Sequence, residues 1–276
     1  EAMKSLSCIY ENWIPAEKIL FTNVWSSELS KLTANAFLAQ RLSSINAISA
    51  LCEETGADIN EVAYAIGSDK RIGDKFLASG PGFGGSCFQK DILNLVYLSR
   101  YYGLDKVSSY WEQVLIVNNW QKERIASLIV EKLFGTVTNK KIALFGFSFK
   151  ANTNDTRESP AISICRDLLE EGCRLSIYDP RVTKEQIDME LEINNQITTF
   201  KDKFDSRWEK NTSVYESALN SDAILLLTDW DEFYEMDLKK LFSNMRIPCW
   251  IFDTRNIINS KEAKSLGFNL WKLGNG

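Results

Sequence analysis

The hydrophobic pattern of this chain changes near residue 140, and that change limits its fold more than any other feature. From Trp25 to about residue 134, apolar residues recur at helical spacing. From Lys140 onward, short apolar runs alternate with helical stretches and are separated by Gly and Pro. This alternation predicts parallel strands joined by helices, which form a doubly wound sheet. The sequence therefore predicts an α/β protein with an all-helical region at 24–136 and a sheet region at 137–276.

Two long helices dominate the predicted helical region. Ser26 or Ser27 can cap the first helix, and Gly56 can end it. The second covers 108–134, a stretch that contains neither Pro nor Gly. Its apolar positions include Trp111, Leu115, Ile125 and Leu128. A single helix with that much apolar surface is expected to pack against a partner.

The sheet region is predicted to alternate strands with helices. The predicted strands are 141–145, 174–178, 223–228, 250–253 and 268–273. The predicted helices are 160–171, 214–219, 237–242 and 260–266. Ser159 followed by Pro160 is a typical helix start, and it opens the first of them. Residues 181–211 are polar and charged, and we interpret them as an insertion.

The first 23 residues form an unusual unit. Residues 2–13 have the pattern of a helix end, and Lys18–Thr22 has that of a short strand. A lone helix and strand cannot bury both of their faces. The segment is either an ordinary N-terminal arm or the tail of a domain that precedes it. A first residue of Glu rather than Met favours the second interpretation.

Composition removes several classes of function. The 276 residues include no His, which excludes a His-based triad, a His metal site and a His general base. The net charge of −5 argues against a nucleic-acid partner, and no apolar run approaches the roughly 20 residues of a membrane helix. The six cysteines form no CxxC pair, so no metal site is expected. Five are expected to be buried thiols in a reducing cytoplasm: Cys8, Cys52, Cys165, Cys173 and Cys249.

The sixth cysteine follows a glycine-rich loop, Gly80-Pro-Gly-Phe-Gly-Gly85. The loop matches the dinucleotide fingerprint GxGxxG in form, but no strand precedes it, so we reject that match. It is either a flexible turn or a cradle whose free backbone N–H groups bind an anion or a substrate. Cys87 lies at the expected start of a helix, where the N-terminus favours a nucleophilic thiolate. Asp91 lies one turn later on the same helix face.

Four segments resemble UDP-glucose 6-dehydrogenases of the animal type: GFGGSCFQKD (82–91), WSSELSKLTANAFLAQR (25–41), GFSFKANTNDTRES (146–159) and FDTR (252–255). The resemblance implies an N-terminal NAD-binding Rossmann domain, a central helical dimerisation domain and a C-terminal Rossmann-like domain that binds UDP. Residues 1–23 would be the tail of the first domain, with the rest of it outside this sequence. Residues 24–136 would be the second domain, and 137–276 the third.

The implied reaction oxidises UDP-glucose to UDP-glucuronate in two steps that each use NAD. Cys87 would add to the intermediate aldehyde as a thiohemiacetal, and its oxidation would give a thioester that water hydrolyses. Lys31 and Asn35 lie four residues apart, so one helix face presents both to a substrate. Lys31 would stabilise the developing charge, and Asp91 would orient Lys31 or a water molecule.

The resemblance also implies the binding residues. Substrate contacts fall on Lys31, Asn35, Arg71, Phe76, Gly80, Phe83, Gly84, Phe149, Lys150 and Arg255. Arg71 would reach into the site of a neighbouring subunit, and Arg157 and Cys87 would meet NAD. Lys150 and Arg255 follow predicted strands, at the edge where open α/β sheets place ligands.

Two functions remain open from the sequence. The chain is either part of an active, self-associating cytoplasmic dehydrogenase, or a non-catalytic module that binds a UDP-sugar and oligomerises. Cys87, Lys31, Asn35 and Asp91 favour the dehydrogenase, because a module without chemistry has no need of them. Ala78 stands where the animal enzymes usually carry Lys, which leaves one phosphate contact open.

Overall fold

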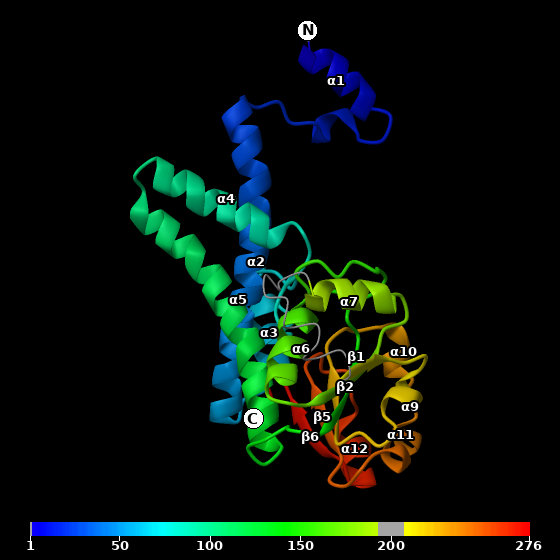
Figure 1. Cartoon of the computed structure of the whole chain (residues 1–276). Helices are drawn as coiled ribbons and strands as arrows, with labels where there is room; N and C mark the ends of the chain where they lie inside the picture. Colours follow the sequence, from blue (N-terminus) through cyan, green and yellow to red (C-terminus); the bar gives the residue numbers. More distant parts are fainter. Residues whose placement is uncertain (1, 193–206) are drawn as a thin grey trace.

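The computed structural model describes residues 2–192 and 207–276, which form a helical part and a sheet part (Figure 1). The helical part contains α2 (Val24–Thr55), α3 (Ile59–Gly67), α4 (Phe88–Tyr101) and α5 (Asp105–Lys132). α4 and α5 pack against each other and against α2, and α5 continues to the sheet part. None of the helices in the described ranges is apolar over a length that could span a membrane.

Within the described residues, the sheet part is built on six parallel strands in the order β3-β2-β1-β4-β5-β6. They are β1 (Lys141–Phe145), β2 (Arg174–Tyr178), β3 (Trp208–Lys210), β4 (Ala223–Leu226), β5 (Trp250–Asp253) and β6 (Asn269–Lys272). The strand order reverses between β1 and β4. Open sheets of this kind bind ligands beyond the carboxyl ends of their strands, next to such a reversal. The predicted doubly wound parallel sheet is confirmed.

Helices cover both faces of the sheet (Figure 1). On one face, α5, α6 (Pro160–Glu170) and α7 (Lys184–Glu192) pack around side chains such as Leu144. The other face is covered by α9 (Val214–Ser217), α10 (Asp231–Tyr234), α11 (Leu238–Asn244) and α12 (Ser260–Leu266), around side chains such as Phe145. Leu144 and Phe145 are neighbours in β1, so their opposite faces follow from the alternation of side chains along a strand.

The predicted strands agree with β1, β2 and β5 residue for residue, and with β4 and β6 to within two residues at their ends. The interpretation of 181–211 as an insertion is wrong in part. α7 packs on the sheet, and β3 pairs with β2 at the sheet edge, with Trp208 opposite Leu175. Residues 193–206 lie outside the described residues. β3 is short and half polar, so it lacks the apolar run that marks the other strands.

The N-terminal segment also differs from its prediction. α1 (Ala2–Tyr10) ends before residue 13, and Lys18–Thr22 is not a strand. Ala16–Lys18 instead forms a 3-10 turn, because the described part of the chain offers that segment no neighbouring strand. Asn23 caps α2 in place of either predicted serine, since its side chain accepts a hydrogen bond from Ser26 N at 2.8 Å.

Two expectations about buried residues are corrected. Cys8 is exposed, whereas the other four expected buried thiols are buried. Four apolar side chains of the second long helix, which we expected to pack against a partner, pack inside their own chain: Trp111, Leu115, Ile125 and Leu128. Other side chains form the exposed apolar surface of the helical part, including Leu29, Phe37, Leu51, Tyr97, Tyr110 and Ile116.

Candidate active site

Cys87 joins the glycine loop (80–85) to α4. It occupies the N-cap position of α4, as its expected place at the start of a helix predicted. The Cys87 carbonyl accepts a hydrogen bond from Asp91 N at 2.9 Å, which starts the helix. The Cys87 side chain is exposed, with Ser86 Oγ 3.8 Å from its Sγ. An accessible thiol at a helix N-terminus has the surroundings of a reactive cysteine rather than those of a structural one.

Asp91 connects the first turn of α4 to α2. Its Oδ2 accepts a hydrogen bond from Asn35 Nδ2 at 2.5 Å and lies 3.3 Å from Lys31 Nζ. The Asp91 side chain is 15% exposed, whereas that of Lys31 is 65% exposed. The carboxylate therefore anchors an ammonium that still faces solvent. Three of the four predicted catalytic residues form one cluster, a helical turn from Cys87.

Buried amide side chains hold the glycine loop from the helical part. Asn118 of α5 accepts from Phe83 N at 2.8 Å and donates to Phe83 O at 3.2 Å. Gly80 N donates to Asn46 Oδ1 at 2.9 Å, and Gly80 O accepts from Gln121 Nε2 at 3.0 Å. A flexible turn would leave these backbone groups to water. The flexible-turn interpretation is therefore wrong, and the loop is a fixed surface.

The sheet part holds the same loop from the other side. Gly85 N donates to Arg157 O at 2.8 Å. A Cβ at Gly84 would lie 2.4 Å from Glu158 O, and a Cβ at Gly85 would lie 3.1 Å from the ring of Phe149. Any larger side chain at Gly84 would therefore push the two segments apart. The glycines allow the helical and sheet parts to meet here.

A buried cation lies behind the glycine loop. Lys122 is 7% exposed, and a Cβ at Gly82 would meet its Cγ at 3.3 Å. Burial lowers the pKa of Lys122, and the charge of Glu158 opposes that shift. A protonated Lys122 would place a positive charge behind the loop, which would suit an anionic ligand.

A pocket of about 160 Å³ lies between the glycine loop and the sheet part. Six of the predicted substrate contacts line it: Gly80, Phe83, Gly84, Phe149, Lys150 and Arg255. Ala78 lines it too, so the position at which we expected Lys in the animal enzymes faces this pocket. Pockets that enclose a drug-sized ligand commonly measure roughly 300–1,000 Å³. A ligand as large as a nucleotide sugar would extend beyond this pocket.

Lys150 and Arg255 bring positive charge to the pocket. Lys150 is exposed, with Nζ 5.3 Å from the centre of the Phe149 ring. Arg255 Nε donates to Leu227 O at 2.7 Å, which fixes the plane of the guanidinium. Burial lowers the pKa of Arg255, and nearby groups, Asp229 first among them, oppose that shift. An arginine nevertheless keeps its charge, so both residues can bind phosphate oxygens.

Arg157 is fixed within electrostatic reach of Cys87. Asp155 accepts hydrogen bonds from Arg157 Nε at 2.9 Å and from its NH2 at 2.7 Å. These bonds raise the pKa of Arg157, to which a Cys87 thiolate adds a smaller contribution. They also lower the pKa of Asp155. The guanidinium is thus held as a stationary cation on the thiol side of the site.

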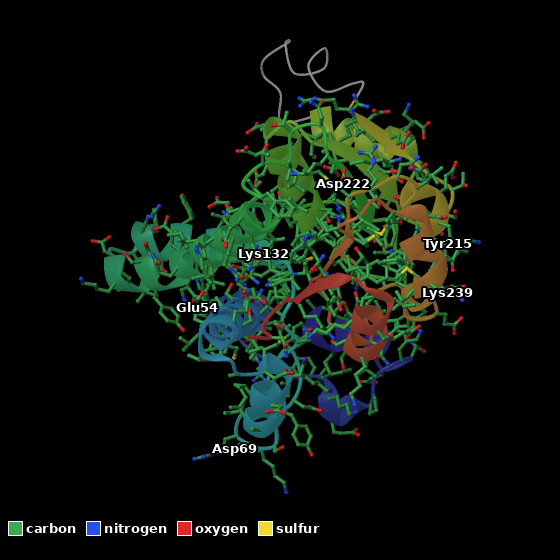
Figure 2. The ribbon with its side chains drawn as sticks, turned by 90° about the horizontal axis from the view of Figure 1, so that it is seen from below. Glu54, Asp69, Lys132, Tyr215, Asp222 and Lys239 are labelled. Atoms are coloured by element: carbon green, nitrogen blue, oxygen red, sulfur yellow. The ribbon has the colours of Figure 1, made fainter. Side chains whose placement is uncertain are left out.

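Arg71 is not brought to the pocket of its own chain. Its side chain is 89% exposed and pairs with Asp69, with NH2 2.6 Å from Oδ2. Figure 2 shows Asp69 at the outer edge of the molecule. Phe76 is 40% exposed, and the centre of its ring lies 6.5 Å from that of Phe88, which lines the pocket. Phe76 is therefore placed at the rim, and Arg71 outside it.

Sequence analysis missed the amides that hold the glycine loop. Asn118 and Gln121 are three residues apart in α5 and therefore share a helix face. Both are buried, as is Asn46 of α2. Polar residues among the apolar positions of a helix are the signal that could have revealed them. Their partners are backbone groups of a distant loop, which the helical pattern does not identify.

Comparison with known proteins assigns a family to both parts of the chain. Residues 25–120 match the central domain of the UDP-glucose/GDP-mannose dehydrogenase family. Residues 143–260 match the UDP binding domain of the same family. Together the two matches cover most of the sequence, and the chain belongs to the UDP-glucose/GDP-mannose dehydrogenase family.

Individual relatives agree with this assignment. UDP-glucose 6-dehydrogenase 3 of Arabidopsis thaliana is 50% identical over 290 residues, which cover 99% of this chain and 58% of the relative. UDP-glucose 6-dehydrogenase of Drosophila melanogaster is 50% identical over 274 residues, covering 99% and 57%. A UDP-glucose dehydrogenase structure from Pyrobaculum islandicum superposes with a TM-score of 0.78 at 26% identity, covering 97% and 56%. The chain thus spans less than two thirds of the length of these relatives.

Proposed function

We propose that this chain supplies the thiol chemistry and the nucleotide-sugar pocket of a UDP-glucose 6-dehydrogenase. The complete protein would oxidise UDP-glucose to UDP-glucuronate with NAD as hydride acceptor. The observation that carries the proposal is the cluster at the start of α4, where exposed Cys87 lies one turn from Asp91. Asp91 is bound to both Lys31 and Asn35. A module that only binds a sugar nucleotide has no use for such a cluster.

Cys87 would retain the aldehyde that the first oxidation of the sugar alcohol produces. Its thiolate Sγ adds to the aldehyde carbon, and the oxygen takes up a proton to give a thiohemiacetal. Loss of a hydride from that carbon, and of the hydroxyl proton, leaves a thioester. Water then adds to the thioester carbon, the C–S bond breaks, and a carboxylate and the Cys87 thiol are released.

Lys31, Asn35 and Asp91 would serve the oxygen atom at the reacting carbon. The Lys31 ammonium can stabilise an oxyanion there and pass a proton to or from it. Asp91 fixes the direction of that ammonium through their 3.3 Å contact. Asn35 donates to the same carboxylate oxygen, which holds Asp91 in place while Lys31 exchanges its proton.

The residues present fit NAD in part. NAD, when bound, accepts the hydride of each oxidation. Arg157 fits an anionic cofactor, because Asp155 fixes its guanidinium within electrostatic reach of Cys87. The loop after β1 carries Gly146 but not the later glycines of a dinucleotide fingerprint. The main NAD site would therefore belong to a preceding domain, of which 1–23 would be the tail.

The pocket beside the glycine loop would take the UDP part of the substrate. Lys150 and Arg255 supply cations for the diphosphate, and Lys122 adds positive charge behind the loop. Phe83 and Phe149 offer aromatic surface in the same pocket. The substrate would thus lie between a central domain at 24–136 and a UDP-binding domain at 137–276.

A second copy of the chain would complete the site. The exposed apolar side chains of α2, α4 and α5 form a surface that suits an identical partner. Arg71 and Phe76 lie outside or at the rim of their own pocket, and Arg71 would reach the pocket of the partner. Free thiols such as Cys87 are maintained in a reducing compartment, so we place the protein in the cytoplasm.

Replacing the nucleophile tests the proposal. In the full-length protein, Cys87→Ser should lower the rate of UDP-glucose-dependent NAD reduction by about a thousandfold or more, because the thioester cannot form. UDP-glucose binding, measured by calorimetry, should persist. Cys8→Ser is the matched control, because Cys8 is the other exposed thiol of the described residues. Full turnover by Cys87→Ser would remove Cys87 from the chemistry, and no turnover by the unaltered protein would favour the non-catalytic module.

A further inference from the structure

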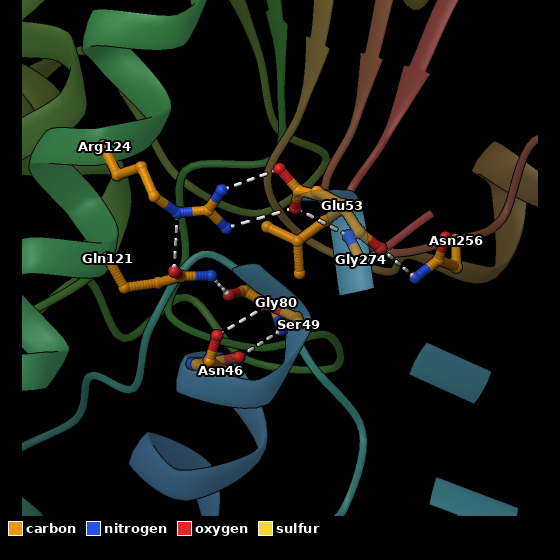
Figure 3. A network of polar contacts seen from close by, with 9 residues as sticks. Asn46, Ser49, Glu53, Gly80, Gln121, Arg124, Asn256 and Gly274 are labelled. Carbon is orange, nitrogen blue, oxygen red and sulfur yellow. Dashed lines mark hydrogen bonds and ion pairs between the residues drawn. The ribbon is translucent and has the colours of Figure 1, made fainter. Parts of the chain in front are cut away.

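A polar network between the helical and sheet parts links Glu53 and Arg124 to Gly80 on one side and to Gly274 and Asn256 on the other (Figure 3). We propose that Glu53, Arg124 and Gln121 are positioning residues for Arg255, and that they set the affinity of the pocket for a nucleoside diphosphate. The inference rests on the proposed function, in which Arg255 binds the diphosphate. It adds three residues that do not line the pocket.

The centre of the network is the ion pair between Arg124 of α5 and Glu53 of α2. Arg124 NH1 lies 2.7 Å from Glu53 Oε2, and NH2 lies 3.2 Å from Oε1. The two side chains are only 15% and 11% exposed. A bidentate pair of planar groups fixes orientation as well as distance. Since neither charge is well solvated alone, the pair ties the two helices together at this point.

One arm runs from Arg124 to the glycine loop. Arg124 Nε donates to Gln121 Oε1 at 3.2 Å, and Gln121 Nε2 donates to Gly80 O at 3.0 Å. A Cβ at Gly80 would lie 3.0 Å from Arg255 NH1, so the backbone of Gly80 lies against the guanidinium. The position of this backbone therefore limits where NH1 of Arg255 can lie, in addition to the bond from Nε to Leu227 O.

The other arm runs from Glu53 to the turn that carries Arg255. Glu53 Oε1 accepts a hydrogen bond from Gly274 N at 2.8 Å. The preceding carbonyl, Leu273 O, accepts from Asn256 Nδ2 at 3.1 Å. Asn256 directly follows Arg255 and has a φ of 58°, in the left-handed region. Its side-chain bond anchors a turn that the backbone alone would not favour.

Both arms depend on the same ion pair, so a shift of Glu53 or Arg124 would move the base and the end of Arg255 together. A guanidinium recognises phosphate oxygens through a rigid fork, which binds well only when its plane is fixed. The geometry thus indicates that the buried Glu53–Arg124 pair, which lies outside the pocket, controls the contact between Arg255 and the diphosphate inside it.

Calorimetric titration of the full chain with UDP tests this assignment. Gln121→Met removes the bond to Gly80 without leaving a buried charge, and it should weaken UDP binding about tenfold. Arg124→Lys keeps the charge but loses the fork, and it should weaken UDP binding similarly. The matched control is Arg100→Lys, because Arg100 pairs with both carboxylate oxygens of Glu112 on the exposed side of α4 and α5. It should leave UDP affinity unchanged.

A double variant separates positioning from general stability. If Gln121 acts through Arg255, then Gln121→Met should have little further effect on UDP affinity in an Arg255→Lys background. An equal loss in both backgrounds would overturn the positioning role, and so would unchanged affinity in Gln121→Met alone. Wild-type UDP affinity in Arg255→Lys would instead overturn the proposed function of Arg255. If Arg124→Lys does not fold, the Gln121→Met results decide.

Discussion

The glycine loop and the Arg71 loop (68–76) belong to the same helical part but differ in what surrounds them. Both have a fixed backbone, because Arg41 donates to Ile72 O and Gly73 O, each at 2.7 Å, much as the buried amides hold the glycine loop. Only the glycine loop is also covered by the sheet part. The side chain of Arg71 extends into solvent with Asp69 as its ion-pair partner. The comparison indicates that one loop forms a pocket wall within the chain, whereas the other leaves Arg71 exposed to solvent.

The largest expected effect comes from releasing the glycine loop. Asn118→Leu removes both partners of the Phe83 backbone and leaves a buried N–H and C=O unpaired. The free energy of unfolding should fall by about 2–4 kcal/mol, and UDP affinity should fall with it. Urea unfolding and calorimetry measure the two effects.

Asn119→Leu is the control for this change, because Asn119 is the exposed neighbour of Asn118 in the same helix. It should alter neither quantity appreciably. If Asn118→Leu kept normal UDP affinity, the glycine loop would not depend on the amides, and the contrast between the two loops would disappear.

A smaller and more selective effect is expected at the Arg71 loop. Arg71→Ala should raise the KM for UDP-glucose in the full-length protein about tenfold, through loss of a charged contact in the partner's site. The free energy of unfolding should change little, because the Arg71–Asp69 pair is exposed. Steady-state kinetics and urea unfolding of the same preparation separate the two. A variant that unfolds more easily but keeps its KM would mean that the loop serves only its own chain.

The smallest effect on the site is expected from a residue in neither loop. Asp167 of α6 has a pKa raised to about 6, mainly by burial and then by Glu170 and Glu123. Since its folded pKa exceeds the ordinary value of 3.8, its ionisation costs stability as the pH rises from about 4 to about 6. Asp167→Asn should therefore stabilise the protein at pH 7 by about 1–2 kcal/mol, after allowance for solvent screening.

The gain from Asp167→Asn should vanish below about pH 4, where the native carboxyl is already neutral. Urea unfolding between pH 4 and pH 7.5 measures it. UDP affinity should not change in Asp167→Asn. The variant therefore shows whether a change in the free energy of unfolding alone leaves UDP binding unaltered. A gain that is independent of pH would exclude titration of Asp167 as its cause.

The sequence predicted the central sheet well, for a physical reason. β1 and β5 are buried on both faces, so they read as continuous apolar runs with clear ends. β3 is a three-residue edge strand with polar residues, and its pairing with β2 decides its structure. The long helices were predictable from periodicity. Periodicity did not predict which face of each helix meets the chain's own core, because both faces carry apolar side chains.

The site was predictable in a different way. The motif resemblance predicted a role for Cys87, which stays a prediction, and the structure brings the predicted Lys31, Asn35 and Asp91 together. Contacts between distant segments were not predictable, since the amide of Asn118 meets the backbone of Phe83, 35 positions earlier in the chain. The location of Arg71 outside the pocket of its own chain agrees with the resemblance, which implies that Arg71 reaches the site of a neighbouring subunit.

The central claim is that the pocket wall and Cys87 come from one chain and Arg71 from a second. Mixing subunits of the full-length protein tests it most directly. Subunits with Arg71→Ala and subunits with Cys87→Ser are combined under conditions that exchange partners, and kcat/KM for UDP-glucose is measured below the KM. A mixed dimer contains one site with an intact thiol and an intact arginine, so the mixture should exceed the activity of the Arg71→Ala protein alone. A mixture with no more than half of that activity would show mere dilution by inactive subunits, and would contradict the shared site.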